Sequence, residues 1–305
     1  MNAGGFGAGA ARRAVVLAAL FLLAFPASAQ IALQLTLEKP RYMRYEPIYV
    51  KLMVKNISGN TLVFDGDGPT GRGSIGFRIE SAGGRQARQY FNAPGTVSGI
   101  PLQNSNLRLA PGQSRQLRIA LNQFYDMQRE GHYTVTALLN HPRLPRTHIS
   151  EPVSVDVQEG YEVMYKNIGL PSDSATDVIK TVKLSLLRFN DVDEDVYCLR
   201  EEDDTNVYAV HRLGSYIDGQ PPQMEIDDSR LVHLLLQIRP RIYAYFIFGF
   251  RGRTIELRQK RFYVSSDGAP PSLSRSAGYL RVEHGRLARP GVDYIERRES
   301  DGSGQ

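Results

Sequence analysis

Residues 121–139, LNQFYDMQREGHYTVTALL, contain the transition that decides the fold. The first half of this stretch is polar and aromatic, and the second half, from Tyr133, alternates apolar and polar side chains. Alternation with a period of two is typical of a half-buried β-strand. Gly131 stands between the halves, where the missing side chain permits a sharp turn. The stretch therefore predicts a corner that leads into a core strand, rather than the edge of an active site.

The same alternation recurs along the first half of the chain, between clusters of turn-forming residues. The alternating runs are at residues 31–37, 48–54, 107–120, 132–140 and 152–158. Pro47 stands at the start of one run, where its missing N–H costs little, and Pro111-Gly112 forms a turn dipeptide within another. Seven or eight short strands with this spacing predict an antiparallel β-sandwich for residues 30–158.

The layout of residues 31–158 is similar to that of a known class of bacterial domains. The residues that carry the similarity are Glu46, Pro47, Asn56, Pro111, Gly112, Tyr125, Asp126, Gly131 and Tyr133. With them the region resembles bacterial exported immunoglobulin-like domains, and more narrowly BsuPI-type domains and the N-terminal β-domain of deuterolysin-like peptidases. The resemblance implies a fold in which Tyr125 braces the corner, as in a tyrosine corner. It carries over no activity, because no HExxH zinc motif follows and no residue matches an inhibitory site.

The first 29 residues predict a secretory signal peptide. Arg12 and Arg13 form a positive start, residues 14–25 are all apolar, and Ala27 and Ala29 supply the small residues of a cleavage site. Cleavage before Gln30 would place the mature chain in the periplasm or outside the cell. The Arg pair leaves twin-arginine export as a less favoured route. After cleavage no segment approaches the ~20 apolar residues of a membrane span.

Charge and cysteine content limit the functions that the mature chain can have. Removing Arg12 and Arg13 from the 37 basic residues leaves 35 against 32 acidic ones, a net charge of +3. So small an excess, without a long basic run, does not predict a nucleic-acid partner. Cys198 is the only cysteine, so no intrachain disulfide can form and stability must come from burial.

The rest of the chain predicts a second β-rich domain and completes an all-β fold of two immunoglobulin-like β-sandwich domains in tandem. Residues 159–178, with GLPSDS, predict a linker that has one helical turn. Residues 179–285 predict a second sandwich or meander, with a hairpin around the polar tip 202–206. Residues 231–238 also fit helical spacing, but the aromatic and β-branched flanking runs favour a strand. Residues 286–305 are charged and predict a loosely ordered tail.

Asp191, Asp193 and Asp195 raise the question of a calcium site, because on one face of a strand they could collect a hard cation. Glu202 also stands at the twelfth position of an EF-hand count from Asp191. However, Val196 occupies the position where an EF-hand needs Gly, and no helices frame the segment. We predict a solvated acidic strand entrance that discourages edge pairing, with calcium as the alternative.

The other apparent motifs predict no chemistry. GDGPTG at residues 66–71 matches GxGxxG but leads into a strand, whereas a dinucleotide site needs a helix there. The six histidines show no metal-ligand spacing. Asp227, Ser229 and His233 could form a Ser-His-Asp set, but no nucleophile elbow or oxyanion segment accompanies them. We therefore expect no catalytic, metal or cofactor-binding residues and no enzyme activity.

Residues 241–250, RIYAYFIFGF, are apolar on both faces of the expected strand. Tyr243, Tyr245 and Ile247 point one way, and the alternate residues, which include Phe246 and Phe248, point the other. One face belongs to the domain core, and the second needs cover from the first domain, the tail or a partner. Cover from within the chain is the favoured hypothesis.

These features favour an exported, non-enzymatic binding or scaffolding protein of the bacterial envelope. A protein partner is the first hypothesis. A glycan- or envelope-binding module is the second, although the chain has no Trp for an aromatic platform. A peptidase-inhibitor-like role is the third, and it rests only on the resemblance of the first domain.

Overall fold

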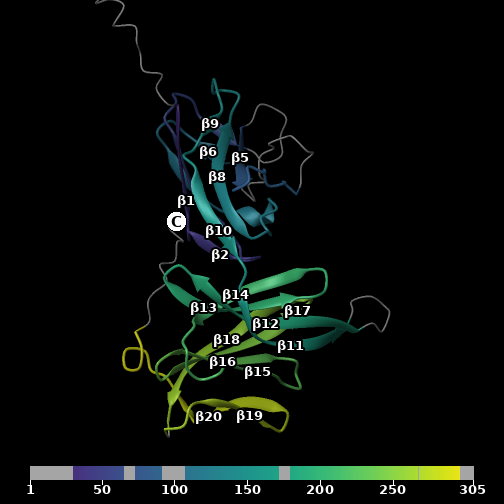
Figure 1. Cartoon of the computed structure of the whole chain (residues 1–305). Coiled ribbons are helices and arrows are strands. Elements are labelled where there is room, and N and C mark those ends of the chain that lie inside the picture. The colour runs from purple at the N-terminus through teal and green to yellow at the C-terminus, as the bar shows by residue number, and fades with distance from the viewer. Residues whose placement is uncertain (1–29, 65–72, 91–106, 172–178, 267, 296–305) are drawn as a thin grey trace, which may run out of the picture.

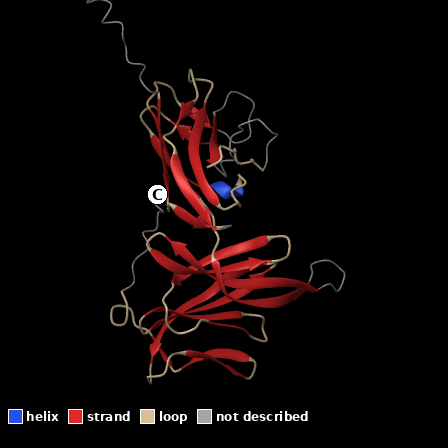
Figure 2. Ribbon diagram, viewed as in Figure 1, coloured by secondary structure: helices blue, strands red, loops and turns tan. Residues whose placement is uncertain are grey.

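The computed structural model describes residues 30–64, 73–90, 107–171, 179–266 and 268–295. Almost all regular structure in these residues is β-strand, with one short 3-10 helix, η1 (Leu121–Gln123) (Figure 2). The prediction of an all-β fold is confirmed for the described residues. The expected signal peptide, the GxGxxG stretch and the last ten residues of the chain lie outside the described residues. Within the described ranges, no helix has the length and apolar character to span a membrane.

Residues 30–160, here called the first unit, form two sheets around a common core (Figure 1). One sheet has the order β1 (Ile31–Leu37), β3 (Tyr49–Asn56), β7 (Ser114–Ala120). The other has the order β2 (Arg41–Met43), β10 (Val153–Gln158), β8 (Gly131–Asn140), β5 (Ser74–Ser81), with β9 (His148–Ile149) also paired to β8. A separate pair joins β4 (Leu62–Phe64) to β6 (Leu107–Leu109). Among the described strands of this unit, β2 and β10 pair in parallel and the other pairs are antiparallel.

The period of two in the sequence determines which side chains form this core. In β3, Val50, Leu52 and Val54 are fully buried, while the intervening Met53 is exposed. Each buried aliphatic side chain contributes about 1.5–3 kcal/mol relative to an exposed one. The alternation therefore stabilises the pairing of the two sheets and also fixes the register of each strand.

The second unit, residues 161–295, begins earlier than the sequence predicts. β11 (Tyr161–Pro171) pairs with β12 (Ile179–Asp191), and β13 (Glu194–Glu202) and β14 (Val207–Ser215) complete a four-stranded antiparallel sheet. The linker prediction for residues 159–178 is wrong for residues 161–171, and residues 172–178 lie outside the description. Ile168 and Leu170 alternate into the core of the unit. The outward-facing Tyr161, Val163 and Tyr165 are aromatic or apolar but exposed, so, together with Gly169, they concealed this alternation.

A second sheet of this unit has the order β15 (Gln223–Ile226), β16 (Val232–Arg239), β17 (Ile242–Arg251), β18 (Thr254–Ser265), β21 (Gly285–Leu287). The predicted meander is present, and the segment that also fitted a helix is strand β16. The loose-tail prediction is wrong for the described part of residues 286–305. Leu287 pairs with Tyr263, and the ring of Tyr294 packs 5.0 Å from that of Phe262.

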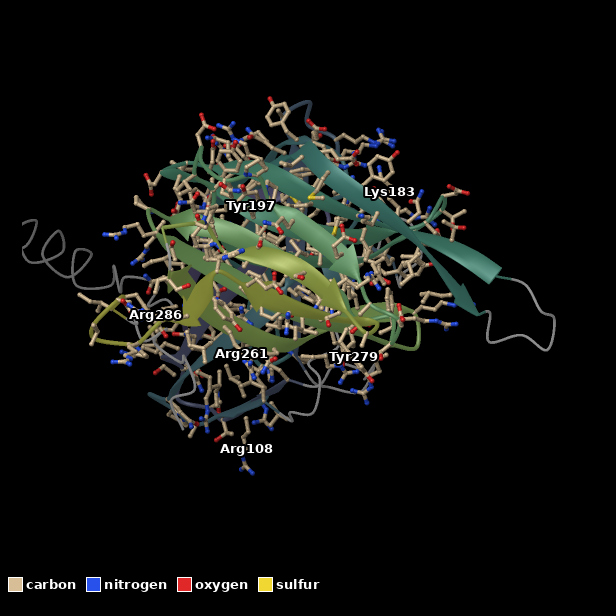
Figure 3. All side chains as sticks on the ribbon, turned by 90° about the horizontal axis from the view of Figure 1, so that it is seen from below. Arg108, Lys183, Tyr197, Arg261, Tyr279 and Arg286 are labelled. Atoms are coloured by element: carbon tan, nitrogen blue, oxygen red, sulfur yellow. The ribbon has the colours of Figure 1, made fainter. Side chains whose placement is uncertain are left out.

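Both apolar faces of β17 are covered by the chain itself. Ala244, Phe246 and Phe248 face the core between the two sheets of the unit. On the other face, Tyr243 and Tyr245 pack against Leu273 and Val282. These two residues come from the hairpin of β19 (Ser272–Ser276) and β20 (Tyr279–Glu283), which is labelled in Figure 1. Figure 3 shows this end of the molecule, with Tyr279 of β20 labelled. The cover comes from within the chain, as favoured, but from neither the first domain nor the tail.

The two units meet at a junction with an apolar centre and a charged rim. Met43 of β2 packs against Leu187, Phe189, Val196 and Cys198, which lie on the outer face of the β11–β14 sheet. At the rim, Arg41 donates to the side-chain oxygen of Asn190 at 2.7 Å. The carboxylate of Glu159 accepts from Arg44 at 3.1 Å and from Arg200 at 2.7 Å, so one side chain ties the two units together.

Candidate functional site

The corner in residues 121–139 is held by two tyrosines with different roles. Tyr133 donates its hydroxyl to the carbonyl of Arg129, four residues upstream, at 2.7 Å, which is the local bond of a tyrosine corner. Tyr125, which the sequence predicted for that role, instead accepts the backbone N–H of Phe77 on β5 at 2.9 Å. Burial raises the pKa of both hydroxyls. Gly131 starts β8 with φ +144, a backbone conformation that favours glycine.

A groove of about 430 Å³ lies beside this corner, between residues 81–88 and residues 126–133. Two backbone hydrogen bonds join the segments that line it, from Ala82 N–H to the carbonyl of His132 at 2.9 Å and from Asp126 N–H to the carbonyl of Arg88 at 2.8 Å. The lining residues are Ser81, Ala82, Gly83, Arg85, Gln86, Ala87, Arg88, Asp126, Arg129, Glu130, Gly131, His132 and Tyr133. We call this feature the corner groove. Its size is within the range of pockets that hold small ligands.

The charges of the corner groove are divided unequally between its walls. The 81–88 wall carries Arg85 and Arg88 and no acidic residue, whereas the 126–133 wall carries Asp126, Arg129 and Glu130. All three Arg side chains are exposed, and none makes an ion pair or a side-chain hydrogen bond with another residue in the described part of the chain. Three guanidinium groups and two carboxylates thus remain able to bind a ligand.

His132, also on the groove wall, is already engaged by a neighbour. Its Nδ1 lies 2.8 Å from a carboxylate oxygen of Asp156, and both side chains are about half exposed. Because β8 and β10 pair directly at these two residues, the contact is a cross-strand pair. His132 therefore helps to fix the groove wall and is not counted among its free charges.

The three aspartates considered for calcium do not share a face. Asp191 ends β12 and Asp195 lies in β13, on the two arms of a hairpin whose turn contains Asp193. Arg212 pairs with Asp191, and Arg188 pairs with Asp195 at 2.7 Å. Hydrogen bonding from Asn190, assisted by Arg188, lowers the pKa of Asp195. The strand-face prediction is wrong, because Val192-Asp193 forms the hairpin turn and reverses the chain between the carboxylates.

Two members of the hypothetical Ser-His-Asp set, Asp227 and His233, are in contact, but Ser229 does not join them. His233 is buried on β16, with Nε2 3.0 Å from Asp227 and Nδ1 2.6 Å from the hydroxyl of Tyr245. Ser229 is exposed in the turn before β16. Both ring nitrogens of His233 are occupied, so neither can take a proton from the Ser229 hydroxyl. The cluster satisfies buried polar groups beneath the β19–β20 hairpin.

Glu201 is a buried acid to which no sequence motif pointed. It lies on β13 and is fully buried, and one carboxyl oxygen accepts the backbone N–H of Ile255 on β18 at 2.7 Å. Its other oxygen has no hydrogen-bond partner among the described residues. Burial raises the pKa of Glu201 to about 7. The nearby His211 bonds the carbonyl of Ile255 through Nε2 at 3.0 Å, so both side chains cap one residue at the start of β18.

Among the described residues, no three or more His, Cys, Asp or Glu side chains form a group that could hold a metal ion. Cys198 is buried at the junction between the units, and burial raises its pKa to about 12. Within the described part of the chain, the corner groove combines a concave surface with charged side chains that have no ion-pair partner. No protein-family model matches the chain, and no curated protein sequence is significantly similar to it.

Proposed function

We propose that this chain is an exported, non-enzymatic binding protein of the bacterial envelope, and that the corner groove is its ligand site. The observation that carries the proposal is the set of free charges around one groove with ordered walls. Ligand sites commonly combine a concave shape with a few well-placed polar groups. The corner groove has this combination at the end of a sandwich, where binding loops are often located.

The hydrogen bonds of the corner support a binding role, because they hold the groove walls before a ligand arrives. Tyr133 fixes the loop that bears Arg129 and Glu130, and the bond from Asp126 N–H to Arg88 fixes the opposite wall. Ordering a loop on binding costs part of the interaction free energy, so a wall that is already ordered favours affinity. Each exposed contact contributes only about 0.2–1 kcal/mol, so several contacts must act together.

The non-enzymatic part of the proposal is supported by the closure of the polar clusters elsewhere. His233, Asp227 and Tyr245 engage one another in a buried position. Glu201 is enclosed between two sheets and caps a backbone N–H. A general base must reach the proton that it removes from a substrate, and these side chains face the protein interior.

A glycine substitution provides a direct test of the groove. A Cβ at Gly83 would meet nothing within 4 Å, so Gly83→Trp should fold while placing a ring in the groove. Gly59→Trp is the matched control, because Gly59 is equally open and lies outside the groove. We expect a thermal-shift screen of peptides, envelope glycans and peptidoglycan fragments to yield ligands that stabilise the wild type and Gly59→Trp but not Gly83→Trp. Ligands that stabilise all three proteins equally, or a screen without any stabilising ligand, would contradict the proposal.

The proposed export of the chain can be tested separately at its N-terminus. Mass analysis of the mature N-terminus in the native host should find Gln30 as the first residue. A mature protein that retains residues 1–25 would contradict export by a cleaved signal peptide.

A further inference from the structure

The chemistry of the corner groove indicates which class of ligand it takes, an inference that rests on the proposed function. We propose that the groove binds a mixed-charge peptide segment, with a carboxylate against Arg85 and Arg88 and a cationic group against Asp126 and Glu130. The free guanidinium groups on the 81–88 wall define the first position. The acidic residues of the opposite wall define the second.

The 81–88 wall is suited to a carboxylate. Guanidinium groups bind carboxylates through paired, charge-assisted hydrogen bonds, which are shorter and stronger than bonds between neutral groups. Arg85 and Arg88 lie on one short segment whose backbone is fixed at several points, including the bond from Ala87 N–H to the carbonyl of Ile79 at 2.8 Å. Because no acidic residue shares this wall, the positive charge of both Arg side chains is available to the ligand.

The opposite wall argues against a uniform polyanion such as a phosphate polymer. Asp126 and Glu130 would repel a second or third phosphate, because like charges close together are unfavourable. Asp126 makes one long hydrogen bond, 3.4 Å from the N–H of Gln128, and Glu130 is exposed without an ion pair among the described residues. With three guanidinium groups against two carboxylates, the groove has a net charge of only +1. A ligand with both signs of charge fits this arrangement better than one with a single sign.

The lining also favours a peptide over a glycan. Glycan sites commonly stack sugar rings on exposed aromatic side chains, and the only aromatic residue in the described lining, apart from His132, is Tyr133, which is 5% exposed. Its hydroxyl is already bonded to the carbonyl of Arg129. The groove therefore offers charged groups and backbone edges rather than an aromatic platform.

The test is a set of double-mutant cycles in fluorescence anisotropy with the full mature chain. The probes are labelled peptides on one Gly-Ala-Ser backbone, with Glu and Lys one to four residues apart, and versions in which Gln replaces Glu, Lys or both. The protein variants are Arg85→Gln/Arg88→Gln and Asp126→Asn/Glu130→Gln. Arg78→Gln/Arg108→Gln is the control, because both residues are exposed arginines of the first unit outside the groove.

We expect one Glu-Lys spacing to bind best, and loss of the peptide Glu to weaken binding about three- to tenfold. That loss should vanish in the Arg85→Gln/Arg88→Gln variant and persist in the control. The effect of the peptide Lys should vanish in the Asp126→Asn/Glu130→Gln variant in the same way. Polyphosphate and uronic-acid oligomers serve as competitors and should displace the mixed-charge peptide weakly.

Other results overturn the inference, and they can be told apart from failure of the proposed function. A mixed-charge peptide ligand would be refuted if the peptide substitutions had the same effect in both groove variants as in the wild type. No binding in the whole peptide set, or stronger binding by the competitors, would refute it as well. If a glycan or phosphate polymer binds and Gly83→Trp abolishes that binding, the groove is still the ligand site and only its ligand class is wrong. If Gly83→Trp affects no ligand, both conclusions fail.

Discussion

Replacing Glu201 by Gln should remove a pH-dependent loss of stability from the second unit. Glu201 is fully buried between β13 and β18, one oxygen caps the N–H of Ile255, and the other oxygen has no partner among the described residues. Taking a carboxylate into such a place costs free energy, so the fold favours the protonated acid. Burial accordingly raises the pKa of Glu201 from 4.5 to about 7.

The sign and size of the effect follow from linkage. The unfolded chain releases the Glu201 proton near pH 4.5, whereas the folded chain keeps it up to about pH 7. The stability that the raised pKa contributes is therefore complete below pH 4.5 and is lost as the pH rises through 7. One pKa unit corresponds to about 1.4 kcal/mol, so the total loss is about 3 kcal/mol. This is a large fraction of the free energy of unfolding of a typical domain.

Urea unfolding of the wild type and Glu201→Gln between pH 4.5 and pH 8.5 measures this loss directly. Gln keeps an oxygen that can accept the Ile255 N–H but cannot ionise. We expect the stability of Glu201→Gln relative to the wild type to rise by about 3 kcal/mol across the range. Glu256→Gln on β18 removes a charge from a half-exposed side chain and should show no such rise. A difference between Glu201→Gln and the wild type that stays constant with pH would refute the reasoning.

Three further predictions test other parts of the structure. Calcium at tens of millimolar should leave the melting temperature within about 1 °C of an EDTA control, because arginines already pair with Asp191 and Asp195; a calcium-specific rise that Asp193→Ala abolishes would contradict this. Cys198 should resist maleimide at pH 7.5 in the folded protein and react fully in denaturant, since it is buried and its pKa is raised to about 12; rapid labelling of the folded chain would show an open junction. Tyr133→Phe should lose the hydrogen bond to Arg129 and lower the free energy of unfolding in urea by about 1 kcal/mol. Tyr165→Phe, at a half-exposed residue, should lower it little. Equal losses in the two variants would refute the role of the corner bond.

Periodicity in the sequence was enough to predict strands such as β3 and β8, because each of them turns one face to the core. The run from Tyr133 forms β8, and Val50, Leu52 and Val54 face the core. For β16, the β-branched and aromatic neighbours correctly favoured a strand over a helix. β11 was missed because the exposed Tyr161, Val163 and Tyr165 interrupt the alternation of polar and apolar residues. Gly169 and Pro171 also resemble linker residues.

The polar sites could not be predicted in the same way, because each depends on which strands become neighbours. Glu201 meets the backbone of Ile255, 54 residues later, only when the two sheets of the second unit pack together. The corner groove likewise needs the 81–88 segment beside the 126–133 loop, which follows it after a long stretch of intervening chain. In the acidic hairpin, a turn of two residues separated side chains that a continuous strand would have placed on one face. Sequence spacing describes faces within one element and carries no information about contacts between elements.

The junction between the units determines which form of the protein should be used to study the groove. The sequence suggested a linker, which would make a fragment of residues 30–158 suitable for binding experiments, but β11 begins directly after Gly160. Such a fragment would expose Met43, which is completely buried against the second unit. It would also lack Arg200 and Glu159, and Glu159 is the residue that binds both Arg200 and Arg44. Arg44 also donates to the carbonyl of Gln128 at 2.8 Å, within the corner loop that carries Asp126 and Arg129. Because Arg44 links the junction to the groove wall, truncation would disturb the groove and the junction together, so loss of binding in the fragment would not locate the ligand site.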